Sequence, residues 1–287
     1  MQKLTYFQVY YILNYYHIYL YFKQMKMLSQ LTKEKSKSIR KLSQKKFREI
    51  ERKFIIEGVK IVQEAMASDW ITESVLVTKE FFSNPSNKDL FKMIEEKGVP
   101  VFQISANDLD AMTDTLTAQG IAAIVEEKIT EHLNLRTLNS LNSIMVAVDR
   151  ISDAGNLGTI IRICDWFKAD ALLIGQESVE LFNPKVVRGT MGSVFHLPIY
   201  RNVDLVRWLS NAKTFGYKVY AATMDGSPLQ SQNYQKKSIF VFGSESHGIS
   251  DGIQRIADTN ITIPRFGKAE SLNVAVACGI VIANFKL

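Results

Sequence analysis

Three polar segments in the second half of the chain carry residue types that could bind a ligand. The first, residues 149–158, is rich in Asp, Ser, Asn and Gly, and Arg162 follows six residues after Asn156. The second, residues 243–248, reads GSESHG, and the third, residues 263–273, reads IPRFGKAESLN. Arginine can stabilise a developing oxyanion or clamp a phosphate. A single loop of this kind is usually only a turn, so the combination of three indicates a site.

Several other kinds of site find no support in the sequence. No GxGxxG, GxxxxGK or GxSxG pattern is present, which argues against the common nucleotide and hydrolase loops. Two cysteines, Cys164 and Cys278, cannot build a disulfide framework or a four-thiolate zinc site, and they favour a reducing, cytoplasmic location. Four histidines without HxxxH spacing predict no metal site. Cys164 lies in an apolar helical stretch and is interpreted as a core residue.

The elements expected to position the three segments alternate between strands and helices. Residues 144–148 form a continuous apolar run, typical of a strand that is covered on both faces. We expect further strands at 171–174, 218–222, 239–242 and 261–263, and helices at 155–168, 203–215 and 271–285, with Ser271 as a candidate N-cap. This alternation predicts an α/β fold with a mostly parallel sheet. Its ligands should bind where loops leave the carboxyl ends of the strands.

The first half of the chain predicts a smaller α/β domain. Residues 29–68 are charged and helix-prone, strands are expected at 74–77, 100–104 and 121–125, and a helix is expected at 89–97. The polar stretch 126–142 is the candidate linker. The predicted domains are therefore 27–125, a small α/β domain, and 143–287, the larger parallel-sheet domain.

Residues 1–26 differ in composition from the rest. No charged residue occurs from Leu4 to Phe22, which is about the length that spans a bilayer. Gln8 and Asn14 interrupt the stretch, and no small-residue cleavage site follows it. Met27 then opens a segment that resembles an ordinary protein start. A leader of doubtful function is favoured, a packed helix and a membrane anchor stay open, and a membrane partner is not expected.

The net charge of +6 is concentrated near the N-terminus. Residues 23–60 contain thirteen Lys or Arg and four Asp or Glu, so the rest of the chain has an excess of about three acidic residues. A basic N-terminal segment on a nearly neutral body indicates a polyanionic partner, most often nucleic acid. A solvated helix face would have the same composition, and charge alone does not separate the two.

Taken in order, the three segments resemble motifs of the SpoU (TrmH-like) family of RNA ribose 2′-O-methyltransferases. The NLGTIIR sequence at 156–162 is similar to the family's first motif, and 243–248 to its second. Ile263 and Pro264, followed by SLNV at 271–274, are similar to the third, and NPKVVRGTMG at 183–192 also resembles a family segment. The resemblance covers about residues 144–287, and residues 45–58 resemble the start of the RNA-binding domain that many members carry.

Some positions depart from the family pattern. Ala154 stands where Pro is common, and Lys168 and Ser246 stand where Gly is frequent. None of these positions supplies a reacting group, so the departures affect loop detail and leave the expected reaction class unchanged.

The resemblance implies a fold, a cofactor and site residues. The family fold is a parallel α/β sheet whose C-terminal part forms a trefoil knot, and its loops hold S-adenosylmethionine. The corresponding cofactor-binding positions are Thr223, Gly243, Ile263 and Leu272. The family places a catalytic arginine at Arg162, which could act as a base through a substrate phosphate or as an electrostatic clamp. The positions expected to order the site beside it are Asn156, Glu245, Ser271 and Asn273.

The resemblance also implies partners. We expect a homodimer that uses the apolar C-terminal helix, and structured RNA as substrate, with ribosomal RNA favoured over transfer RNA. The residues expected to contact RNA phosphates are Lys45, Lys46, Arg48 and Arg52. Two alternatives stay open, a non-catalytic RNA-binding or ribosome-assembly protein and an enzyme that methylates a base nitrogen. The Asn-x-Gly…Arg motif argues against the second.

Overall fold

The computed structural model describes residues 28–113, 118–128, 135 and 143–287. Residues 1–26 and most of 126–142, for which the sequence predicts a leader and a linker, lie outside the described residues. The chain divides into two compact units after Glu126. Within the described ranges, no helix is both long and apolar enough to cross a membrane.

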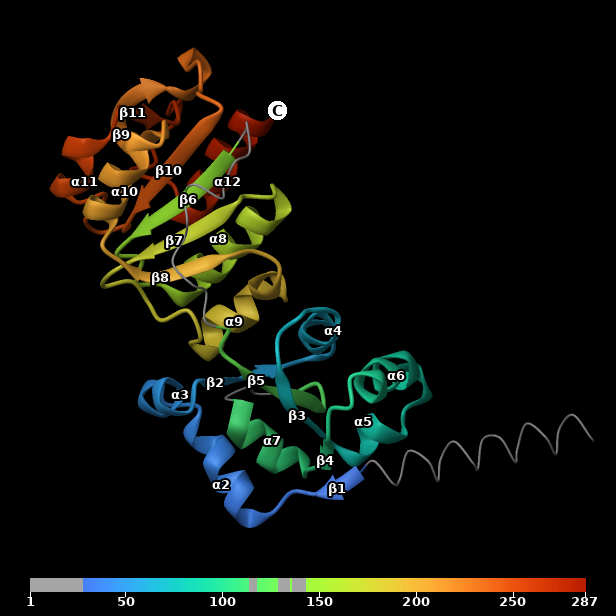
Figure 1. Cartoon of the computed structure of the whole chain (residues 1–287). Helices are drawn as coiled ribbons and strands as arrows, with labels where there is room; N and C mark the ends of the chain where they lie inside the picture. Colours follow the sequence, from blue (N-terminus) through green and yellow to red (C-terminus); the bar gives the residue numbers. More distant parts are fainter. Residues whose placement is uncertain (1–27, 114–117, 129–134, 136–142) are drawn as a thin grey trace, which may run out of the picture. The chain divides into compact units, whose positions relative to one another are not determined.

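The N-terminal unit is built on a five-stranded mixed sheet with the order β1-β4-β3-β5-β2 (Figure 1). Strands β1 (Leu28–Gln30), β4 (Val101–Gln103) and β3 (Thr72–Val77) are parallel. Strand β5 (Ile121–Glu126) runs antiparallel to both β3 and β2 (Lys53–Glu57). The helices are α2 (Lys33–Lys41), α3 (Lys45–Glu51), α4 (Val59–Ala67), α5 (Lys79–Ser83), α6 (Lys88–Glu96) and α7 (Ala106–Thr113), with a 3-10 turn, η1 (Pro85–Asn87).

The helical pattern predicted for residues 29–68 is wrong at residues 53–57. Helix α3 ends at Arg52, whose φ of 51° places it in the left-handed region, and strand β2 follows. Phe54 and Ile56 of β2 are buried, whereas Ile55 between them is half-buried, as the two-residue period of a strand requires. Pairing of β2 with β5 therefore overrides the helical propensity expected for these residues.

The C-terminal unit is built on a six-stranded sheet in which every paired strand is parallel. Its order is β11-β9-β10-β6-β7-β8. The strands are β6 (Ser143–Asp149), β7 (Ala171–Gly175), β8 (Ile199–Val203), β9 (Lys218–Pro228), β10 (Lys237–Gly243) and β11 (Thr259–Thr262). All seven residues of β6 are buried, as the continuous apolar run predicts. Strand β8, in which the adjacent residues Arg201 and Asn202 are exposed, was not expected from the sequence.

Helices cover both faces of this sheet (Figure 1). Helices α10 (Leu205–Thr214) and α11 (Asp251–Ile256) pack on one face, where Leu209 and Ile253 join the buried core of β6 and β10. Helices α8 (Ala154–Trp166), α9 (Pro184–Thr190) and α12 (Val274–Lys286) lie on the other face, and two 3-10 turns, η2 (Ser193–Phe195) and η3 (Leu229–Ser231), complete the unit. The prediction of a parallel α/β sheet is confirmed.

Helices α8 and α9 cross at two glycines. A Cβ on Gly158 would lie 2.8 Å from the carbonyl oxygen of Val186 and 2.9 Å from the Cα of Gly189. The two backbones are therefore too close for any side chain at Gly158. This glycine of the first motif holds α8 against α9 and so fixes the helix that carries Asn156 and Arg162.

Candidate active site

A cavity of about 600 Å³ lies at the carboxyl ends of β9, β10 and β11. This is the edge at which parallel sheets bind ligands, and the volume is typical of a small-molecule site. The cavity is lined by all four residues that the family resemblance assigns to the cofactor, Thr223, Gly243, Ile263 and Leu272. Residues from three separate loops therefore meet in one cavity.

The cavity wall combines apolar side chains with an unsatisfied hydroxyl. Ile249, Ile261 and Val281 are buried and contribute apolar surface to the lining. The Thr223 hydroxyl oxygen is buried and has no hydrogen-bond partner among the described residues. Because a buried polar group without a partner is unfavourable, Thr223 fits a ligand that supplies a donor or acceptor there. An amphipathic molecule such as S-adenosylmethionine matches this lining.

Strand β9 shapes this cavity through an irregular pairing with β11. Ala221 is paired with Asn260, but the next residue of β11, Ile261, is paired with Ser227. Residues 222–226 of β9 therefore have no partner on β11 and bulge from the ladder, which brings Thr223 to the cavity. The sequence predicted β9 only over residues 218–222.

Gly243 is required by the turn that follows β10. A Cβ at this position would lie 2.2 Å from the carbonyl carbon of Gly248. Ser244 and Gly248 form an isolated bridge, and the Gly248 amide donates to the Ser244 carbonyl at 2.7 Å. The absence of a side chain at Gly243 thus allows the 243–248 turn to close.

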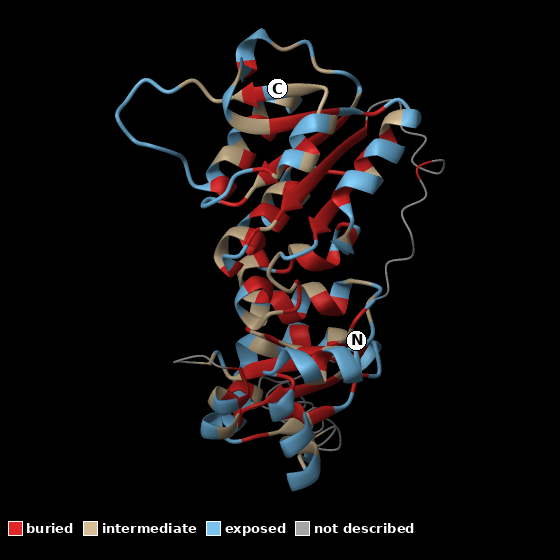
Figure 2. Cartoon of the chain, turned by 90° about the vertical axis from the view of Figure 1, so that its left-hand side faces the viewer, coloured by how far each residue is buried: buried red, intermediate tan, exposed pale blue. Residues whose placement is uncertain are grey.

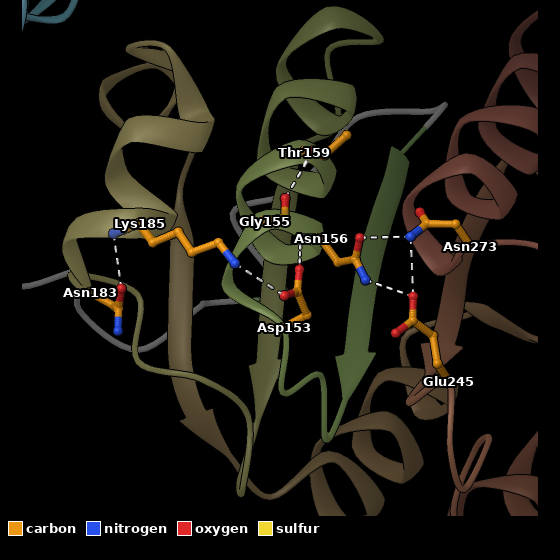
Figure 3. A network of polar contacts seen from close by, with 8 residues as sticks. All are labelled: Asp153, Gly155, Asn156, Thr159, Asn183, Lys185, Glu245 and Asn273. Atoms are coloured by element: carbon orange, nitrogen blue, oxygen red, sulfur yellow. Dashed lines mark hydrogen bonds and ion pairs between the residues drawn. The ribbon is translucent and has the colours of Figure 1, made fainter. Parts of the chain in front are cut away.

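Three polar side chains from distant parts of the sequence form one hydrogen-bonded network beside the cavity (Figure 3). The Asn156 amide on α8 donates to Glu245 Oε1 at 2.6 Å. The Asn273 amide donates to Asn156 Oδ1 at 2.8 Å and to Glu245 Oε1 at 3.1 Å. Glu245 also lines the cavity, so the network connects the cavity to the beginnings of α8 and α12.

The last helix is capped by Asn273, so the prediction of Ser271 as its N-cap is wrong. The Asn273 Oδ1 accepts hydrogen bonds from the amides of Ala275 at 3.0 Å and Val276 at 3.3 Å. Asn273 thus caps α12 with its oxygen while its nitrogen donates to the network. Ser271 is exposed and lines the cavity instead.

Arg162 lies on the exposed side of α8, six residues after Asn156. Six residues correspond to about 9 Å along a helix, so Arg162 is displaced from the network along α8. In the described part of the chain, its guanidinium forms no hydrogen bond or ion pair. The charge is therefore available to an anionic ligand, although Arg162 is not part of the cavity lining.

The start of α8 is fixed by Asp153, which the sequence did not single out. Asp153 Oδ1 accepts from the backbone N–H of Asn156 at 2.8 Å, and Lys185 Nζ on α9 lies 3.4 Å from its other oxygen (Figure 3). The hydrogen bond from the Asn156 backbone, assisted by Lys185, lowers the pKa of Asp153. Asp153 therefore stays ionised and orients the helix turn that presents Asn156.

Comparisons with known proteins agree with this arrangement. The family model described as SpoU rRNA Methylase matches residues 143–283, and the MRM3-like substrate binding domain matches residues 33–123. A Bacillus subtilis (strain 168) protein, 23S rRNA (guanosine(2553)-2'-O)-methyltransferase RlmP, is 34% identical over 263 residues, which cover 91% of this chain and 100% of that protein. The chain belongs to the SpoU family of RNA methyltransferases. The family predicted from the motifs is confirmed.

Two solved structures share the fold over 90% of this chain. An S-adenosylmethionine-bound rRNA methyltransferase from Sinorhizobium meliloti is 31% identical, with a TM-score of 0.77, and covers 90% of this chain and 97% of its own. A TrmH-family protein from Porphyromonas gingivalis is 27% identical, with a TM-score of 0.75, and covers 90% of this chain and 99% of its own. The predicted SpoU-type fold class is confirmed.

The N-terminal basic residues differ in their surroundings. Lys45, Lys46 and Arg52 are exposed, and Lys45 lies 3.7 Å from Glu49. Arg48 is only 3% exposed, and its guanidinium donates to the carbonyl oxygens of Leu42 and Ser43, both at 2.8 Å. This burial argues against the expected contact of Arg48 with RNA phosphates, because its guanidinium holds the turn between α2 and α3.

Sequence reasoning also missed parts of the cavity. Met224 and Asp225 in the β9 bulge and Phe266 in the third loop all line it. The bulge leaves no sequence signal that we recognise. Phe266 had one, since it is an aromatic residue between Arg265 and Gly267 in a loop that the motifs had already marked.

Proposed function

We propose that the protein transfers a methyl group from S-adenosylmethionine to a ribose 2′-hydroxyl of ribosomal RNA. When bound, S-adenosylmethionine supplies an electrophilic methyl group on a sulfonium. Thr223, Gly243, Ile263 and Leu272 hold it in the cavity at the strand ends. The observation that carries this proposal is the network of Asn156, Glu245 and Asn273, because it joins the proposed cofactor cavity to the first-motif helix.

Arg162 is the proposed catalytic residue. A ribose hydroxyl is a poor nucleophile at neutral pH, and a nearby positive charge stabilises the alkoxide that develops when it attacks. The exposed guanidinium of Arg162 can form two parallel hydrogen bonds to a substrate phosphate, which fixes the adjoining ribose. Because an arginine pKa exceeds about 12, proton transfer to that phosphate suits this site better than proton transfer to arginine.

The supporting network would order the loops around the ribose. The side-chain amide of Asn156 donates to Glu245, and that of Asn273 donates to Asn156. These hydrogen bonds would hold the beginnings of α8 and α12 in a fixed position relative to each other. Glu245 and Ser271 line the cavity. The Glu245 carboxylate can accept hydrogen bonds from ribose hydroxyls, and the Ser271 hydroxyl can donate or accept them. Their role is to position the ribose for attack, and small displacements at such a site reduce rates strongly.

Ribosomal RNA is the proposed substrate, recognised through the N-terminal unit. The name of the Bacillus subtilis relative specifies 2′-O methylation of 23S rRNA, and the match to a substrate binding domain covers residues 33–123. Lys45, Lys46 and Arg52 are exposed cations that would contact phosphates. Transfer RNA is the alternative substrate, and non-catalytic RNA binding is the alternative function.

A homodimer completes the proposal. Helix α12 buries Val274, Cys278 and Val281, yet Val276 and Ile280 on its outer side are 51% and 39% exposed. These two residues are four apart and form one apolar strip, which a second copy of the chain would cover. Sedimentation of the wild-type protein and of Ile280→Glu measures this, and a monomeric wild-type enzyme with full activity would contradict it.

The function is tested with purified protein, methyl-labelled S-adenosylmethionine and RNA from cells with and without the gene. We expect label in ribosomal RNA from the gene-deleted cells, at a ribose, which makes the neighbouring linkage resistant to alkali. Label confined to transfer RNA would favour the alternative substrate, and label on a base would contradict the reaction. RNA binding without any transfer would favour the non-catalytic function.

A further inference from the structure

One aromatic side chain at the cavity, that of Phe266, has not been given a role so far. Phe266 is 97% exposed, although its segment lines the cavity. Deeper in the same lining, Ile261 is fully buried and Ile263 is half-buried. The apolar floor is therefore provided by other residues, and the phenyl ring of Phe266 remains at the mouth.

The loop around Phe266 is closed by a hydrogen bond and carries two positively charged side chains, Arg265 and Lys268. The Arg265 guanidinium donates to the carbonyl oxygen of Ala269 at 3.4 Å, which draws together the two ends of the segment that contains Phe266. Lys268 is exposed and forms no ion pair within the described residues. An aromatic ring thus lies two residues from an unpaired cation.

This combination matches single-stranded nucleic acid better than it matches a cofactor. Binding of S-adenosylmethionine buries the cavity lining, whereas a ring that is 97% exposed has its faces available to a molecule that arrives from solvent. Proteins bind unpaired nucleotides by stacking bases on aromatic rings while cations contact the backbone phosphates. Methylation of a ribose also requires a nucleotide that is accessible at the cavity mouth.

We propose that Phe266 stacks on a nucleobase of the RNA substrate at the mouth of the cavity, and that Lys268 contacts an adjoining phosphate. Phe266 is then a substrate-positioning residue that acts in addition to the proposed catalytic Arg162. This inference rests on the proposed function, because it assumes that RNA reaches this cavity to be methylated.

The test compares Phe266→Ala, Phe266→Leu and Phe266→Tyr, with ribosomal RNA from cells that lack the gene as the probe. Loss of stacking should raise the KM for RNA by about 5- to 100-fold in Phe266→Ala. Leucine is apolar but cannot stack in the same way, so Phe266→Leu should resemble alanine, whereas Phe266→Tyr should stay near wild type. Because the side chain is exposed, all three variants should keep the wild-type Tm.

Controls separate stacking from other roles. Val206→Ala removes an apolar side chain that is 41% exposed on α10 and should change nothing. The affinity for S-adenosylmethionine, measured by calorimetry, and the sedimentation coefficient should be the same in Phe266→Ala and wild type. Lys268→Ala should flatten the salt dependence of RNA binding by about one ion.

Four results would overturn the proposal. They are an unchanged KM in Phe266→Ala, full activity in Phe266→Leu, reduced cofactor affinity, and a shift to monomer, the last of which would assign the ring to contact with a second copy. Filter binding of the same RNA needs no turnover. If the wild-type protein transfers no methyl group, the proposed function fails, while a binding defect in Phe266→Ala would still support the stacking contact.

Discussion

The two units of the chain hold their polar side chains in different ways. In the C-terminal unit, Asn156, Glu245 and Asn273 come from three segments far apart in the sequence and form hydrogen bonds with one another. In the N-terminal unit, charged side chains form small, partly exposed ion-pair groups, such as the one in which Lys35 and Lys53 lie 3.3 and 2.8 Å from Glu73. A convergent network should fail as a whole when one member is lost, whereas dispersed surface charges should contribute small, additive amounts.

The Glu73 cluster shows how modest the dispersed interactions are. Burial opposes ionisation of Glu73, but hydrogen bonds and attraction from Lys53 and Lys35 outweigh it and lower its pKa. A carboxylate with a lowered pKa stabilises the fold above its unfolded pKa, and this contribution is lost as the pH falls through the folded value. Because about a third of each side chain is exposed, solvent screens the cluster and its contribution is small.

The largest expected effect is that of Arg162→Ala. Loss of one preorganised electrostatic stabiliser should lower the methylation rate by about a hundredfold or more. The affinity for S-adenosylmethionine should change little, because Arg162 is not part of the cavity lining. Arg162→Lys should restore little activity, since a point charge cannot reproduce the planar guanidinium. Single-turnover rates and calorimetry measure the two quantities.

Near-normal turnover in Arg162→Ala at saturating RNA would remove the catalytic assignment. A variant that binds RNA and cofactor normally but transfers no methyl group would support it. We also expect that these experiments need no added metal and that cofactor binding is identical with and without a chelator.

The second prediction separates the two functions of Asn273. In Asn273→Asp the oxygen can still cap α12, but the side chain no longer donates to Asn156 and places a second carboxylate near Glu245. Stability should therefore be close to wild type, whereas the rate should fall by roughly tenfold or more through misplacement of the site. Thermal unfolding and kcat measure the two effects.

Asn273→Ala removes the cap as well and serves as the matched variant. It should also lose about 1 kcal/mol of stability, the usual cost of removing an N-cap side chain. Equal activity of Asn273→Asp and wild type would mean that the network is structural and does not order the reacting groups.

The third prediction concerns the crossing of α8 and α9. Gly158→Ala would place a Cβ 2.8 to 3.0 Å from the α9 backbone, which cannot yield as a flexible side chain would. We expect a loss of about 1–3 kcal/mol in the free energy of unfolding. Gly279→Ala on α12 is the control, because its Cβ would meet only Ile163 Cδ1 at 3.6 Å, an ordinary contact. A Tm for Gly158→Ala equal to that of Gly279→Ala would contradict the tight crossing.

The sequence predicted the C-terminal unit better than the N-terminal one for a physical reason. A parallel sheet covered on both faces leaves continuous apolar runs, as in β6, and its loops gather the motif residues at one edge. Strand β2 is half-buried and mixes charged with apolar residues, so its pattern fits a helix as well as a strand. The roles of Arg48 and Asn273 depend on which backbone groups lie nearby, and composition and spacing do not reveal that.

The smallest expected effect is that of Lys46→Ala. Lys46 is exposed on α3 and forms no ion pair within the described residues, so its removal should leave the fold and the saturated rate unchanged. RNA affinity should fall a few-fold, and the slope of log K against log salt should decrease by about 0.7 to 0.9. Filter binding across a salt series measures the slope.

Arg48→Met is the matched variant for comparison with Lys46→Ala, because it removes a buried cation and leaves the carbonyl oxygens of Leu42 and Ser43 without their donor. It should lower stability by about 1–3 kcal/mol, and the salt slope, measured below the unfolding temperature, should match wild type. If Arg48→Met changes the slope as Lys46→Ala does, the buried arginine contacts RNA after all.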